Sequence, residues 1–151
     1  MFAKVVKGRQ LKVIPVIIWG FIILLHTWTS NLGALLRNQT FSFTWIVSPD
    51  YLSFFYLQDI STIHHYFIIV KTGHFVGFAI FDYLLFKWLN NHKRSLVISI
   101  SFALITEILQ LYFGRDGRMY DLVIDTLGIL TVYFLLKVHL FTKQSHLTKS
   151  N

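Results

Sequence analysis

Four long apolar runs constrain this chain more than any other feature of its sequence. A helix needs roughly 20 predominantly apolar residues to cross the hydrocarbon core of a bilayer. Inside that core every backbone polar group must be bonded within the chain, so such a run forms a helix. We therefore expect an all-α polytopic membrane protein, a bundle of four transmembrane helices in one domain over residues 1–151. The expected spans lie near residues 13–28, 66–89, 95–113 and 120–141.

The composition agrees with a membrane-embedded chain. Hydrophobic residues make up 54% of the chain and charged residues 14%, against about 25% charged residues in soluble domains. The formal net charge of +7 suggests nucleic-acid binding at first sight. The basic residues, however, lie in short flanks beside the apolar runs, which is typical of membrane topology. We therefore expect membrane lipids as partners and no nucleic acid. The absence of cysteine excludes disulfides and thiolate sites.

The distribution of lysine and arginine predicts the orientation of the chain. A cytoplasmic N-terminus leaves only Arg37, Arg115 and Arg118 on the outer side. Cytoplasmic flanks are enriched in basic residues, so this topology is favoured and both termini are expected in the cytoplasm. The cytoplasmic side then collects Lys4, Lys7, Arg9, Lys12, Lys87, Lys93, Arg94, Lys137, Lys143 and Lys149.

The segment over residues 30–65 is the one long connection, and it faces outward in this topology. It is rich in aromatic residues, and Phe41, Phe43 and Trp45 alternate with polar residues. Trp and Tyr are favoured at the headgroup level, so this outer loop can rest in the membrane interface. Long loops are also often functional, so a lid over a ligand is the other interpretation.

Polar side chains stand at helical spacing around one turn between the last two spans. Glu107 and Gln110 lie three residues apart, and Asp121 and Asp125 lie four apart, so each pair shares a helix face. Between them, residues 114–118 read Gly-Arg-Asp-Gly-Arg and predict a tight turn. Two apolar helices therefore meet at this turn, each with carboxylates close to it.

The second span also carries ionisable residues on one face. Lys71, His74 and Asp82 recur at helical spacing. An Asp or Lys inside hydrocarbon costs about 2.5–3.5 kcal/mol on insertion scales, so such residues face the bundle and mark pairing or function. Gly73 and Gly77 form a small-xxx-small pair on another side, which we interpret as a helix-packing contact.

Three helices place polar groups at the same depth. Counting 1.5 Å of rise per residue from the outer end of each span puts all of these groups in the outer half of the bilayer. Each has a structural interpretation as well: Asp121 suits a helix N-terminus, and Glu107 can pair with Lys71 or Arg115. These separate interpretations do not explain why all of the groups lie at the same depth. The groups are Lys71, His74, Glu107, Gln110, Asp121 and Asp125.

In these motifs the chain resembles the VanZ-like family of bacterial membrane proteins. The resemblance rests on Lys-x-x-His from Lys71, Glu-x-x-Gln from Glu107, the turn Gly114-Arg115, and Asp121 followed by Asp125-Thr-Leu-Gly. Many members have proline before the turn glycine and Asn at the second Asp. The resemblance implies a small multi-span protein of the bacterial cytoplasmic membrane, and the namesake is associated with reduced susceptibility to teicoplanin. It supplies no reaction.

One hypothesis for the function is binding or shielding at the outer leaflet. Arg115 and Arg118 lie where lipid phosphates or lipid-linked precursors reach, and arginine grips such anions bidentately. The expected partners are membrane lipids and, beyond these, a lipid-linked cell-wall precursor or a lipoglycopeptide. We assign no cofactor and no metal. The candidate ligand-binding cluster is Lys71, His74, Glu107, Gln110, Arg115, Arg118, Asp121 and Asp125.

Two other classes of function stay open. An intramembrane hydrolase would use the carboxylates and His74 as metal ligands or as acid and base. The sequence has no His-Glu-x-x-His motif, nucleophile elbow or phosphate-cradling loop, so nothing in it names a reaction. A proton-coupled transporter would relay protons through the same groups. Because the inner half of the bundle is apolar, transport would require a homo-oligomer.

Overall fold

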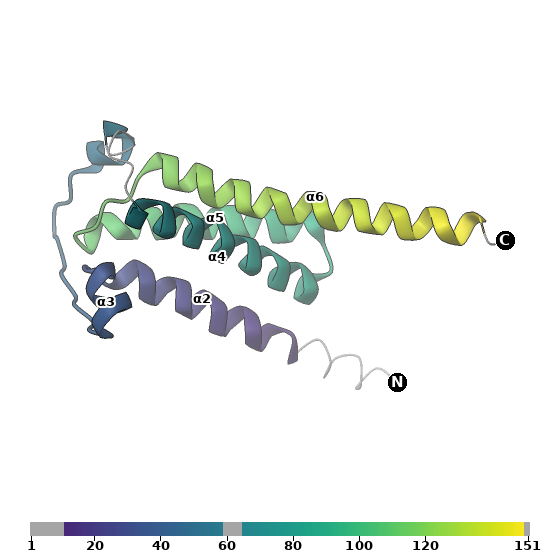
Figure 1. The fold of residues 1–151 in the computed structure, drawn as a ribbon, viewed down its shortest axis with the longest axis horizontal. Helices are drawn as coiled ribbons and strands as arrows, with labels where there is room; N and C mark the ends of the chain where they lie inside the picture. The colour runs from purple at the N-terminus through teal and green to yellow at the C-terminus, as the bar shows by residue number, and fades with distance from the viewer. Residues whose placement is uncertain (1–10, 59–64, 150–151) are drawn as a thin grey trace.

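The computed structural model describes residues 11–58 and 65–149, and these residues contain helices and no strand. The elements in chain order are α2 Val13–Trp28, α3 Leu32–Asn38, the 3-10 helix η1 Tyr51–Phe55, α4 His65–Leu89, α5 His92–Tyr112 and α6 Met119–Lys149 (Figure 1).

Three of these helices are long and apolar enough to cross a membrane. The qualifying segments are Phe67–Leu89 in α4, His92–Tyr112 in α5 and Met119–Val138 in α6. The all-α class and the corresponding three spans therefore agree with the sequence prediction. Helix α2 is apolar but has 16 residues, which is about 24 Å at 1.5 Å per residue and short of a core of about 30 Å. A fourth span at α2 stays a prediction.

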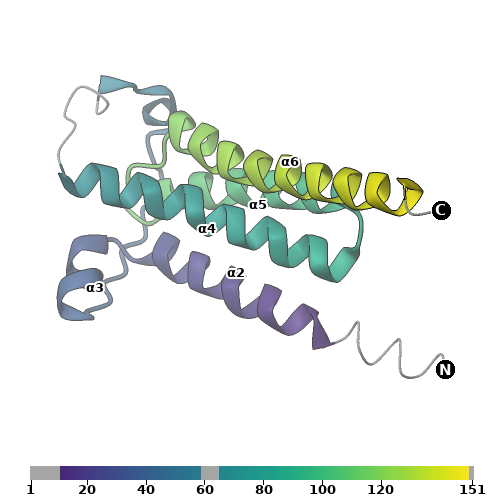
Figure 2. The same cartoon turned by 45° about the vertical axis from the view of Figure 1, so that its right-hand side comes forward.

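Helices α4, α5 and α6 lie side by side, and α2 packs along the side of α4 away from α6 (Figures 1 and 2). Helices α4 and α5 are joined by Asn90 and Asn91 alone, and the Asn91 side chain caps α5 by accepting from the Arg94 N–H. Residues 113–118 join α5 to α6 at the other end of the bundle. We call the end formed by this turn, α3 and η1 the loop end.

The segment over residues 30–65 is more structured than the predicted outer loop. It contains α3 and η1, and residues 59–64 lie outside the described part. The stretch between α3 and η1 crosses the loop end, where the Ile46 N–H donates to the Tyr112 carbonyl at 2.8 Å. Trp45 stacks on Tyr112 with ring centroids 5.2 Å apart. These contacts with the end of α5 fix the path of the segment, and the sequence pattern does not reveal them.

Polarity is distributed as in a membrane protein. Apart from Ile129, the largest fully buried side chains are polar or acidic, and they include Glu107 and Asp125. Many large aliphatic and aromatic side chains of the helices are exposed. This pattern places apolar side chains on the outer faces, where hydrocarbon would lie, and allows the buried polar groups to bond one another in the interior. Examples of the exposed set are Ile17, Phe21, Val97, Ile105, Val123, Phe134 and Leu135.

Helix α6 approaches α4 closely at Gly128. Gly128 is buried, and a Cβ atom there would overlap the Phe75 carbonyl. One turn of the interface is therefore built on backbone contact, which only glycine allows. Beside it, Phe78, Ala103 and Ile129 form a small apolar cluster between the three long helices.

The interpretation of Gly73 and Gly77 as a helix-packing pair is wrong. A Cβ atom at either position would meet nothing within 4 Å. Helix α2 instead contacts α4 through a large side chain, since the Trp19 indole donates to the Gly77 carbonyl at 2.9 Å. An apolar cluster of Val16, Phe81 and Leu85 continues the contact. Both glycines line a cavity between the two helices.

Candidate functional site

Lys71 and Asp121 form an ion pair between α4 and α6. The Lys71 Nζ lies 2.6 Å from Asp121 Oδ1 and 2.7 Å from Oδ2. The Phe67 and Tyr120 rings flank the ammonium group at 4.9 and 4.8 Å from their centroids. Asp121 lies in the first turn of α6, as its interpretation as a helix N-terminal residue expects. It also provides the carboxylate that holds Lys71.

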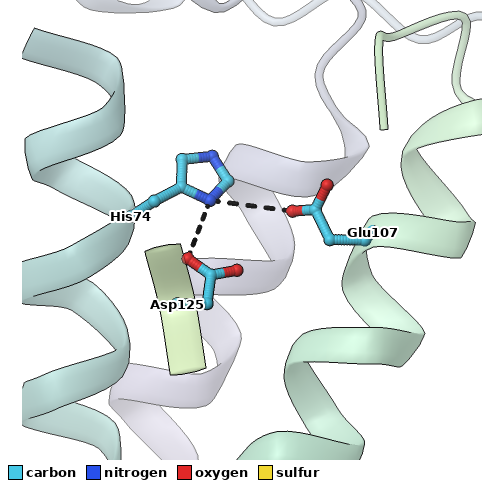
Figure 3. A group of neighbouring side chains, drawn as sticks. All are labelled: His74, Glu107 and Asp125. Carbon is cyan, nitrogen blue, oxygen red and sulfur yellow. Dashed lines mark hydrogen bonds and ion pairs between the residues drawn. The ribbon is translucent and has the colours of Figure 1, made fainter. Parts of the chain in front are cut away.

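His74 faces two buried carboxylates from two other helices (Figure 3). Its Nδ1 lies 3.1 Å from Asp125 Oδ1 and 3.6 Å from Glu107 Oε1. The Glu107 and Asp125 side chains are both fully buried. Helices α4, α5 and α6 thus each contribute one group to a compact acidic and basic cluster, which we call the His-Glu-Asp cluster.

Glu107 is held by hydrogen bonds to its own helix and to the following turn. The Gln110 Nε2 donates to Oε1 at 3.0 Å, and the Arg118 backbone N–H donates to Oε2 at 3.1 Å. The turn reaches this position because Gly117 lies against the Glu107 carbonyl, where a Cβ atom would overlap. Pairing of Glu107 with Lys71 is therefore wrong as an interpretation, since Lys71 bonds Asp121.

The two arginines of the turn have different surroundings. The Arg115 Nη1 donates to the His26 carbonyl at the end of α2 at 2.5 Å. Arg118 is only 6% exposed, and its guanidinium donates to the Ser53 carbonyl and to Asp116 Oδ1 at 2.8 and 3.0 Å. Arg118 therefore joins the turn to η1, whereas Arg115 lines cavity space. A role for either in ligand binding stays a prediction.

Two cavities meet at His74. One has a volume of about 340 Å³ and lies between α2 and α4, with walls that are mainly apolar. The other has a volume of about 400 Å³ and opens at the loop end, and its walls combine charged and polar residues with apolar ones. Both are lined by Val70, His74, Gln110 and Arg115. The main apolar walls are Trp19, Ile22, Ile23, Ile69, Val76 and Phe78.

Residues of α2 and α3 also contribute to the two cavities, and the sequence pattern did not predict this. His26 and Thr27 line the apolar cavity, and Asn31 and Arg37 line the polar one. The one available signal was His26, an ionisable residue close to the C-terminal end of the first apolar run. The remaining lining residues belong to no motif and join the site through tertiary packing alone.

Asp82 belongs to a separate interaction. Its side chain is 1% exposed and accepts from the Ser99 hydroxyl at 2.9 Å. A hydrogen bond of this kind lowers the cost of a buried carboxyl group. Asp82 shares the face of His74 in the sequence pattern, but this bond to α5 gives it a structural role outside the His-Glu-Asp cluster.

Comparison with known proteins identifies the family. A family model described as VanZ/LLP1 matches residues 12–141. The chain belongs to the VanZ/LLP1 family. Among its VanZ/LLP1 relatives, the uncharacterized membrane protein YwnJ of Bacillus subtilis (strain 168) is 37% identical over 119 residues, 78% of this chain and 84% of that protein. No solved structure matches the chain. The matched region includes α2 and all residues of the cluster, so the VanZ-like resemblance is confirmed and extends over the first apolar helix.

Proposed function

We propose that this VanZ/LLP1 protein binds or shields an anionic amphiphile at the outer leaflet of the bacterial cytoplasmic membrane. The observation that carries the proposal is the junction of a polar and an apolar cavity at His74, Gln110 and Arg115. A ligand with a charged head and an apolar chain would occupy both at once. Pockets of this kind combine apolar walls with a few placed polar groups that fix orientation.

The charge of the polar cavity favours an anionic head group. Its walls carry the basic residues Arg37, Lys71 and Arg115 against the acidic residues Asp116 and Asp121. With His74 neutral, these five groups sum to one positive charge. Hydrogen bonds from basic side chains to phosphate or carboxylate are about twice as strong as neutral ones, and arginine makes them in pairs.

The distribution of basic residues supports an outward-facing loop end. Among the described residues, the flanks of the opposite end hold most lysines and arginines, as the positive-inside rule expects for the cytoplasmic side. The loop end also exposes aromatic residues, among them Phe43 and Trp45 at 62% and 60%. Such side chains suit the headgroup region of a bilayer.

The three ligand sources share one chemistry. An anionic phospholipid, a lipid-linked cell-envelope precursor and a lipoglycopeptide each join polar or anionic groups to an apolar chain. Binding of a precursor or a lipoglycopeptide would link the site to resistance against glycopeptide antibiotics such as teicoplanin. Separate binding measurements for each source therefore decide which part of the proposal holds.

Replacement of Arg115 by alanine should weaken ligand binding about tenfold or more. A hydrogen bond to a charged group contributes about 1.5–3 kcal/mol, which corresponds to at least a tenfold change in the dissociation constant. The measurement is binding of phosphatidylglycerol, a polyprenyl phosphate and teicoplanin, each separately, to the purified protein in neutral detergent. Arg115→Lys should retain part of the affinity, because it keeps the charge and loses the bidentate geometry.

Arg94→Ala is the matched control for this experiment. Arg94 is an exposed arginine at the opposite end of the bundle, in the first turn of α5. Its loss removes the same charge and should leave all three affinities unchanged. Binding that is equal in the wild type and Arg115→Ala, or equally weakened in Arg94→Ala, would contradict the proposed head-group site.

A further inference from the structure

We propose that His74, Glu107 and Asp125 form a binding site for a divalent transition-metal cation of the Zn²⁺ type. Each residue comes from a different long helix, and one ligand atom of each lies within 4.8 Å of the other two (Figure 3). One imidazole nitrogen and two carboxylate oxygens suit Zn²⁺, which binds in open sites through three protein ligands and one exchangeable ligand.

The separations of the ligand atoms match the size of such a cation. Bonds of about 2.0–2.1 Å in tetrahedral geometry place neighbouring ligand atoms about 3.4 Å apart. The His74 Nδ1 lies 3.1 Å from Asp125 Oδ1 and 3.6 Å from Glu107 Oε1. These two distances lie on either side of the expected value, and the third separation, between the carboxylate oxygens of Glu107 and Asp125, is within 4.8 Å. A cation would draw these two oxygens together.

Hydrogen bonding alone leaves this cluster incomplete. The same His74 nitrogen faces both carboxylates, and a ring nitrogen carries at most one hydrogen to share between them. Asp125 is 0% exposed, and its Oδ2 has no hydrogen-bond partner in the described part of the chain. A buried carboxylate oxygen without a partner carries a desolvation cost that a bound cation would offset.

The charges of the two buried carboxylates also favour a bound cation. When ionised, Glu107 and Asp125 bring two negative charges into the interior of the bundle. The neighbouring lysine, Lys71, already pairs with Asp121. A buried carboxylate that stays ionised is paired or coordinates a metal. A single divalent cation would neutralise both carboxylates, with neutral His74 as its third ligand.

The surroundings already orient the ligands. Gln110 and the Arg118 N–H fix both oxygens of Glu107, the kind of outer support that metal-binding carboxylates receive. His74 lines both cavities while its Nδ1 faces the carboxylates, so the site lies directly behind a cavity wall. The inference does not depend on lipid binding, because all three ligand atoms belong to this chain.

The test is Zn²⁺ binding to the purified full-length protein without an affinity tag and without added lipid. Equilibrium dialysis with elemental analysis should find one Zn²⁺ per chain in the wild type. Loss of a residue that only orients a metal ligand costs about 10–100-fold in metal affinity. Asp125→Asn and Glu107→Gln each remove a ligand itself, so each should weaken Zn²⁺ binding about 100-fold. Bound Co²⁺ should give a d–d absorption spectrum that both variants lose. Each substitution keeps the side-chain shape, and the thermal transition of each variant reports whether it folds.

Asp82→Asn is the matched control for the metal site. It removes a buried carboxylate from the same helix as His74, at a position bonded to Ser99, and should leave Zn²⁺ affinity unchanged. Absence of stoichiometric binding in the wild type would overturn the inference. Wild-type affinity in both Asp125→Asn and Glu107→Gln would also overturn it, because binding would then belong to other histidines. Both outcomes are read without lipid, so they are independent of the proposed function.

Discussion

Replacement of Lys71 by methionine should lower the free energy of unfolding by about 3 kcal/mol. The substitution leaves Asp121 without its ion-pair partner, and the Asp121 side chain is only 2% exposed. Breaking a buried ion pair from one side costs about 3–5 kcal/mol, because the remaining charge is buried and unpaired. We place the effect at the lower end because the Lys71 side chain is 17% exposed. Steric trapping in bicelles measures this free energy.

Two further variants isolate the ion pair. Lys71→Met combined with Asp121→Leu should recover most of the lost stability, since an apolar pair can replace a buried ion pair at little cost. Lys87→Met is the control, because Lys87 is an exposed lysine of the same helix, and such surface changes stay within about 0.5 kcal/mol. Equal effects of Lys71→Met and Lys87→Met would contradict the structural importance of the pair.

Gly128→Ala should lower the free energy of unfolding by about 2 kcal/mol. The new methyl group would overlap the Phe75 carbonyl, so α4 and α6 must move apart. Forcing extra atoms into a packed interface costs about 1–3 kcal/mol, with backbone contacts at the upper end. The helix propensity of alanine returns about 1 kcal/mol and reduces the net loss. The same unfolding measurement applies.

Gly73→Ala is the control for this substitution. Gly73 is also a helical glycine, but a Cβ atom there meets nothing within 4 Å. The change should therefore be neutral or stabilising by up to about 1 kcal/mol. If Gly73→Ala lost as much stability as Gly128→Ala, the effect of Gly128→Ala could not be assigned to the close approach of α4 and α6.

The helices were accessible from the sequence because their causes are local. The predicted second span, 66–89, differs from α4 by one residue at its start. Apolar composition defines each helix, and Asn90, Asn91 and the Gly114 turn interrupt it. Gly114 has φ of 68°, a conformation that favours glycine, as expected from its place in the turn. Local signals of this kind can be read without knowledge of the tertiary structure.

The partners inside the cluster were harder to predict. Spacing and depth indicated that Lys71, Glu107 and Asp121 lie at one level, but they did not indicate which carboxylate Lys71 meets. That choice depends on how each helix is rotated about its axis. The rotation is set by packing such as the Gly128 contact and the cluster around Phe78, which involves residues far apart in the sequence.

The cavities and the loop segment could not be predicted for the same reason. Gly73 and Gly77 have the spacing of a packing motif, but the Trp19 ring keeps α2 from closing on them. The path of the loop segment depends on contacts with the end of α5, including a hydrogen bond of 2.6 Å between the hydroxyls of Tyr51 and Tyr112. Both features arise from tertiary contacts between residues far apart in the sequence, and such contacts leave no periodic pattern.

Photolabelling tests the central claim, binding of an anionic amphiphile across both cavities, most directly. An anionic lysolipid with a diazirine near its chain end would be added to right-side-out vesicles that contain the protein, with inverted vesicles as the control. We predict adducts on Ile22, Ile23 and Phe78 in right-side-out vesicles, and their loss in Gly73→Phe, where the new ring fills the apolar cavity. Adducts spread over outward-facing residues such as Phe134, and unchanged by Gly73→Phe, would contradict the account.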